Sequence, residues 1–140
     1  MSMAALYQAL RLNLANASPI WADRAYADIA PAGVTRPYVV WFAVSGGRDL
    51  VRQDVQSASY VVTVKCVADT LALSLAGQEA IRAVLDDNGT QDRRNTLVQP
   101  TGWRVHTITA DRAVHVVERF EGAQAIYHDG YQYSVVMEAV

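Results

Sequence analysis

The three histidines, His106, His115 and His128, have the widest range of possible chemistry in this chain, as acid–base catalysts or as metal ligands. His106 and His115 lie in two predicted neighbouring strands, where they could approach one another. A zinc site needs further ligands in fixed geometry, and the sequence has no HExxH, CxxC or HxH spacing to supply them. Asp129 follows His128 at a turn signal, so we expect it to shape a turn. The histidines are therefore expected to serve surface or packing roles, with no metal bound.

Other motifs for catalysis or ligand binding are missing from the sequence. There is no GxSxG elbow for hydrolysis, and no Walker A or GxGxxG loop for phosphates. Gly46-Gly47 is better explained as a hinge, and Asp86-Asp87-Asn88-Gly89 as the end of a helix rather than a calcium loop. The tyrosines near the end of the chain lack the basic groove that base stacking requires, because 120–140 contains no Lys or Arg. We expect no enzymatic activity and no cofactor.

Length and composition indicate one globular domain spanning 1–140. The chain has 140 residues, 51% hydrophobic and 19% charged, with a mean hydropathy of +0.05. Domains most often contain roughly 100–150 residues. Twelve basic and fourteen acidic residues give a net charge of −2, which argues against a polybasic binder of nucleic acid or membrane surfaces.

The sulfur and basic residues are unusual in kind. Cys66 is the single cysteine, which excludes an intramolecular disulfide, and its apolar alternating context predicts a buried thiol. Eleven of the twelve basic residues are Arg, which is enriched at protein interfaces, and only Lys65 is lysine. No signal peptide or membrane-spanning run is evident, so we expect a protein that is intracellular or assembled inside a cell.

Two amphipathic helices are predicted, over 3–17 and 71–87. Apolar residues recur at helical spacing in both, and Asp69 or Thr70 can cap the second helix. The expected apolar faces consist of Met3, Leu6, Tyr7, Leu10 and Leu14 in the first, and Leu73, Ala76, Ala80, Ile81 and Val84 in the second.

Strands account for most of the remaining chain. A short strand within 21–29 is ambiguous, and a polar connection at 45–56 is expected to form the long arm of an antiparallel hairpin. Residues 90–101 are expected to be an exposed loop, with turns at 110–112 and at Asp129-Gly130. Five strands are predicted at 38–44, 57–67, 103–110, 115–120 and 131–140. This order predicts an α+β fold in two layers, with two helices packed on one face of a mostly antiparallel sheet.

Several segments taken in order resemble one known family. The resemblance spans nearly the whole chain, although each segment alone is an ordinary strand or turn. The segments are the opening helix, Ala30-Pro31 through Arg36-Pro37-Tyr38-Val39-Val40, the run from Tyr60 to Asp69, and Tyr127-His128-Asp129-Gly130-Tyr131-Gln132-Tyr133. In these features the chain resembles the tail-terminator proteins of long-tailed bacteriophages, also called tail-completion or tail-to-head joining proteins.

The resemblance implies a structural virion protein at the head-proximal end of the phage tail, assembled in the host cytoplasm. Such a protein forms a homo-oligomeric ring of six copies that ends the tail tube and contacts the tube protein and the head-side connector. DNA passes through the lumen, no membrane is involved, and the family carries no catalytic residues. The arm at 45–56 and the loop at 90–101 correspond to ring and axial contacts. The interface candidates are therefore Arg48, Asp49, Arg52, Asp54, Arg93 and Arg94.

Two alternatives remain open at this point. The chain could be a head-side connector or neck component of the same particle, since fold class does not separate these positions. It could also be a small hydrolase or ligand-binding domain that uses His106, His115 and nearby acids. The hydrolase alternative requires the two imidazoles to converge in one pocket.

Overall fold

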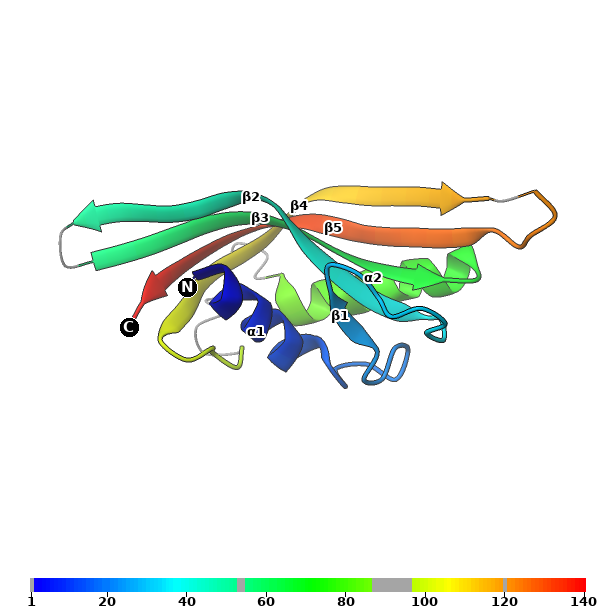
Figure 1. Cartoon of the computed structure of the whole chain (residues 1–140), viewed down its shortest axis with the longest axis horizontal. Helices are drawn as coiled ribbons and strands as arrows, with labels where there is room; N and C mark the ends of the chain where they lie inside the picture. Colours follow the sequence, from blue (N-terminus) through cyan, green and yellow to red (C-terminus); the bar gives the residue numbers. More distant parts are fainter. Residues whose placement is uncertain (1, 53–54, 87–96, 120) are drawn as a thin grey trace.

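The computed structural model describes residues 2–52, 55–86, 97–119 and 121–140, and at 2, 47–52 and 55–56 it describes the backbone alone. These residues form two helices and five strands: α1 (Ser2–Leu14), β1 (Ala25–Ala27), β2 (Tyr38–Arg52), β3 (Val55–Ala68), α2 (Leu71–Leu85), β4 (Trp103–Glu118) and β5 (Ile126–Ala139). The sheet order is β1-β2-β3-β5-β4, parallel at β1–β2 and antiparallel elsewhere. Both helices lie against the same face (Figure 1). The predicted two-layer α+β fold is confirmed.

The two faces of the sheet differ in what covers them. The covered face contacts the helices and carries Val62, Val64 and Cys66 of β3 with Tyr133 and Val135 of β5, all of them buried. The open face carries the alternate residues of each strand, among them Val61 and Lys65 of β3 and Gln132, Ser134 and Val136 of β5, and no described helix lies against it.

The core lies between the helices and the covered face. Leu6, Leu10 and Leu14 of α1 are at most 2% exposed, as the helical spacing predicts, whereas Met3 is 42% exposed and does not belong to the core. The helix ends at Leu14 rather than at 17, because Asn16 adopts a left-handed φ of 61° that a helix cannot continue. The Trp21 indole N–H donates to the Leu14 carbonyl at 2.7 Å and satisfies the helix end.

Helix α2 begins where predicted but buries a different face. Thr70 caps it by accepting a hydrogen bond from the Leu73 N–H at 3.2 Å. Leu73 is only half-buried and Ala76 is exposed, so the predicted apolar face is wrong at these positions. The buried positions are Ser74, Gly77, Gln78, Ile81 and Leu85. Polar residues belong to this buried face because the sheet supplies hydrogen-bond partners for them. A hydrophobic pattern in the sequence cannot predict such partners.

Strands β2 and β3 are longer than predicted. The ladder continues through Arg48↔Ala58 to Arg52↔Val55, so 45–52 and 55–56 are strand rather than an irregular connection. The glycines and charged residues at 46–49 hid this extension, because no apolar alternation marks it. The expected hairpin with a long arm is confirmed, and Figure 1 shows it reaching past the helices at one end of the sheet. The ambiguous segment at 21–29 contributes β1, a three-residue parallel edge strand.

The last part of the sheet holds two strands where three were predicted. Residues 103–118 form one strand, with register shifts beside His106 and Asp111, so the turn at 110–112 is wrong. Asp129-Gly130 lies inside β5, not in a turn. A Cβ on Gly130 would lie 2.0 Å from the Val64 carbonyl oxygen and 2.5 Å from the Lys65 Cα. The glycine is therefore required for close strand contact.

The segment before β4 is described from residue 97 onward. Leu97 is buried at 9% exposure, and the Asn13 side chain of α1 exchanges two hydrogen bonds with the Val98 backbone, at 2.8 and 2.9 Å. The part of the predicted exposed loop at 97–101 thus packs on α1. Residues 90–96, like the predicted helix stop at Asn88-Gly89, lie outside the described residues.

Candidate functional site

Three of the six predicted interface candidates lie in the part of the chain that the structure describes. Arg48, Asp49 and Arg52 lie on the arm part of β2, opposite Ala58, Ser57 and Val55 of β3. The arm, defined here as 47–52 with 55–57, thus brings three of the six candidates onto one strand. Asp54, Arg93 and Arg94 lie outside the described residues.

The base of the arm depends on Gly46. Its φ is +130°, a conformation that L side chains rarely adopt, and an added Cβ would lie 2.3 Å from the Ser59 carbonyl oxygen. The ladder shifts register between Ala43 and Ser45, which marks a bulge just before this glycine. A shallow hollow of about 290 Å³ lies here, lined by Ser45, Gly46, Ser59, Tyr60, Val61, Ser134, Val135 and Val136. The hollow lies where the arm meets the rest of the sheet, and apart from Tyr60 its lining consists of small and aliphatic residues.

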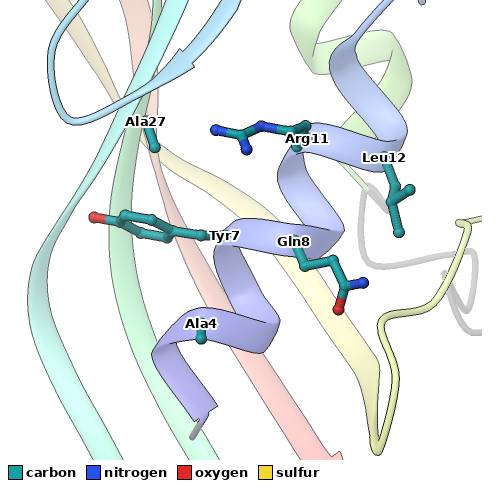
Figure 2. Close-up of a pocket in the computed structure, with 6 residues that line it drawn as sticks. All are labelled: Ala4, Tyr7, Gln8, Arg11, Leu12 and Ala27. Atoms are coloured by element: carbon teal, nitrogen blue, oxygen red, sulfur yellow. The ribbon is translucent and has the colours of Figure 1, made fainter.

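A second, larger pocket of about 560 Å³ lies beside α1 at the edge of β1. The Tyr7 hydroxyl donates to Asp28 Oδ1 at 2.7 Å and accepts from the Ala43 N–H at 3.0 Å. Burial raises the pKa of Tyr7. Figure 2 shows Tyr7 and Arg11 reaching from α1 toward β1, while Gln8 projects from another side of the helix. Tyr7 therefore completes the edge of β2 where β1 ends, and the side chains lining this pocket do not converge on a reacting atom.

The histidines do not converge as the hydrolase alternative requires. Both His106 and His115 lie on β4, not on two strands. His115 Nδ1 lies 2.5 Å from Asp129 Oδ1, on the covered face, whereas His106 Nδ1 lies 3.9 Å from Glu138 Oε1. Asp129 and Glu138 are nine positions apart on β5, whose pairing with β3 is regular, so they lie on opposite faces of the sheet. The two imidazoles therefore lie on opposite faces and do not form the single pocket that this alternative requires.

A buried polar network joins α2 to β5. Ser74 Oγ donates to Asp129 Oδ2 at 2.7 Å, and the Gln78 amide donates to the Gly130 carbonyl at 2.9 Å. Ser74 and Asp129 are at most 1% exposed, while the His115 side chain is 54% exposed. The serine contacts the carboxylate and not the imidazole, so the order differs from that of a nucleophilic triad. The network holds the helix to the sheet, a role that turn chemistry at Asp129 did not predict.

Cys66 behaves as the buried thiol that the sequence predicts. It is fully buried against α2, where a Cβ on Gly77 would lie 2.3 Å from its Sγ. Burial, with a smaller effect of Asp129, raises the pKa of Cys66 to about 12. A thiol that stays protonated is a poor nucleophile and metal ligand.

The described residues also limit other kinds of site. Among them, no cluster of three His, Cys, Asp or Glu residues could hold a metal ion. Within the same part of the chain, neither helix has the length and apolar character needed to cross a bilayer.

Comparison with known proteins finds a likeness in structure rather than in sequence. No protein-family model matches the chain, and no curated protein matches it. Among solved structures, it is similar to a chain from the virion of a native gene transfer agent particle. The TM-score is 0.62 at 20% identity, and the match covers 97% of this chain and 93% of that chain. At this identity the likeness shows a shared fold over essentially the full length of both chains.

Proposed function

We propose that this chain is a structural protein of a phage-like virion, which ends the tail tube and joins the tail to the head as a ring-forming oligomer. The observation that carries the proposal is the fold shared, over 97% of the chain, with a component of a gene transfer agent virion. The family resemblance of the sequence supports the same assignment independently of that likeness. The finer statements, tail termination and a ring of about six copies, come from that resemblance.

The shape of the molecule suits assembly more than chemistry. The arm carries Arg48, Asp49 and Arg52, and Asp54 follows in the sequence. Opposite charges on one projection suit a head-to-tail ring, in which two different patches of the same protomer meet. A long ordered arm also costs conformational entropy, which contact with a neighbour would offset. Arg48, Asp49, Arg52, Asp54, Arg93 and Arg94 are accordingly proposed as contacts to the neighbouring copy, the tube protein or the head-side connector.

The proposed ring surrounds DNA in transit and does not process it. A net charge of −2 suits a lumen through which DNA slides, because phosphate contacts dominate non-specific affinity for DNA. The protein acts in this proposal without catalysis, metal or cofactor, at the head-proximal end of the tail.

Negative-stain imaging of the purified protein mixed with its tail-tube subunit tests the proposal. We expect a ring at one end of each tube. Tubes with bare ends, under conditions where the protein is folded, would contradict it. Immunogold labelling of tails purified without heads separates the two virion positions, because a head-side connector would be missing from them.

A further inference from the structure

Among the described residues, the outer edge of β4 has side-chain partners at Val105 and Ala110 in its first half, and no strand pairs with it over its second half. On the side away from β5, the Val105 N–H donates to the Gln99 side chain at 2.7 Å and the Ala110 N–H donates to Asp86 Oδ1 at 3.2 Å. From 112 to 118, the only strand among the described residues that pairs with β4 is β5. In Figure 1 this half of β4 runs along the margin of the sheet. Its outward backbone groups can therefore accept another strand.

The middle of this half, 113–117, also lacks the usual protection against strand pairing. Val116 and Val117 are 46% and 40% exposed on opposite faces of the strand. The run Ala113-Val114-His115-Val116-Val117 contains no proline, lysine or glycine. Natural edge strands are commonly blunted by charges, proline or bulges. Here the bulge at Asp111 stops short of the run and leaves it free to pair.

The sequence of this edge is complementary to itself. We infer that residues 112–118 of β4 pair antiparallel with the same residues of a second copy of this chain, about a two-fold axis at His115. In that register each Arg112 lies opposite a Glu118 of the other copy, and each Val114 opposite a Val116. Directly opposed residues share a face of the sheet, so both pairs lie on the open face. Two ion pairs thus flank a cluster of four valines.

The register also decides the form of the complex. In this register His115 of one copy lies opposite His115 of the other. The covered faces of both copies then lie on the same side, so two five-stranded sheets join into one. Glu118 already contacts His128 Nε2 within its own chain, and Arg112 of the second copy adds a cation to that carboxylate. The interface is isologous and closes at two copies, so it describes the isolated protein, whereas the proposed ring uses different, head-to-tail contacts. It does not depend on the proposed function in the tail.

Sedimentation of the isolated protein across a range of concentrations tests this interface. We expect the mass to rise from 15.3 kDa toward twice that value. Arg112→Glu alone, or Glu118→Arg alone, places two like-charged pairs in the interface and should raise the dissociation constant about tenfold. The double variant R112E/E118R restores both pairs and should return the constant close to the wild-type value. Arg11→Glu makes the same change of charge on an exposed position of α1 and should have no effect.

Several results would overturn the inference. They are a wild-type protein that stays monomeric throughout, association that neither single change weakens, or a double variant that does not recover. Circular dichroism checks that each variant is folded, and if one single variant is not, the other single variant and the double variant still decide. Capping of tail tubes by R112E is measured separately, so that a failed edge interface is not confused with a failed tail function.

Discussion

The β2–β3 and β4–β5 hairpins point toward opposite ends of the same sheet (Figure 1), and they are held in different ways. The turn end of β4–β5 rests on α2 through Ser74, Gln78 and the buried Asp129. The arm of β2–β3 follows a bulge and Gly46, and β5 remains paired with β3 as far as Ser57, so that only the outer part, 50–52 with 55–56, is a ladder of two strands. The difference teaches that one end of the sheet belongs to the protomer's own core, whereas the arm suits contact with something outside it.

Gly130→Ala should break the anchored hairpin and give the largest effect. The new Cβ meets backbone atoms of β3 at 2.0 and 2.5 Å, which no rotamer change relieves. We expect a loss of about 3 kcal/mol or more in the free energy of unfolding, measured by denaturant titration. Gly102→Ala is the control, because its φ is +80° but its Cβ would meet no atom within 4 Å. Equal losses in the two variants would contradict close strand contact at Gly130.

Gly46→Ala should loosen the arm while the core stays folded. The clash with Ser59 and the φ of +130° are both severe, but beyond Gly46 β2 pairs with β3 alone among the described strands and can separate from it locally. We expect a loss of about 2 kcal/mol, with faster amide hydrogen exchange confined to the arm. Uniformly faster exchange, including α2 and β5, would show that the arm is part of the same cooperative unit as the core.

Acidification should weaken the anchored hairpin through His128. Burial, and less strongly Lys65, lower its pKa below the ordinary value of 6.5, while Glu118 and Asp129 act in the opposite direction. The unfolded chain then binds the His128 proton more tightly than the folded protein does. The stability that the neutral His128 side chain contributes is therefore present above pH 6.5 and is lost as the pH falls below that value. Thermal unfolding at about pH 7.5 and about pH 5.5 should show a smaller loss for His128→Gln than for the wild type. A larger loss of thermal stability in the variant than in the wild type would contradict the assignment of acid sensitivity to His128.

Charge reversal on the arm should have the smallest effect on stability and a clear effect on assembly. Arg48→Glu combined with Arg52→Glu should change the free energy of unfolding by no more than about 0.5 kcal/mol, as we expect for side chains that act in assembly and not in the core. Binding to tube ends, counted by electron microscopy, should fall strongly. The variant Arg11→Glu controls for charge alone, and retained capping by the arm variant would remove Arg48 and Arg52 from the proposed interface.

The sequence predicted the parts of the fold that hydrophobic patterning controls. Leu6, Leu10 and Leu14 are buried at helical spacing, and the alternation around Cys66 marks a central strand. It missed what depends on partners distant in the chain. Asp129-Gly130 has the chemistry of a turn, but β3 and α2 hold it inside a strand.

The candidate site was predictable only in position. Arg48, Asp49 and Arg52 were expected on an arm and lie on one, but their polar run concealed a continued strand. A strand whose sequence lacks apolar alternation is not recognised by a hydrophobic pattern. The edge at 112–118 was not predicted either. Here the turn signal at Asp111 divided one strand into two predicted strands.

Tube length measures the central claim most directly, since a terminator ends growth and does not merely bind. Tail-tube subunits polymerised with increasing amounts of this protein should give progressively shorter tubes, each closed by a ring at one end. Tube lengths that stay unchanged at a molar excess of folded protein would contradict the claim.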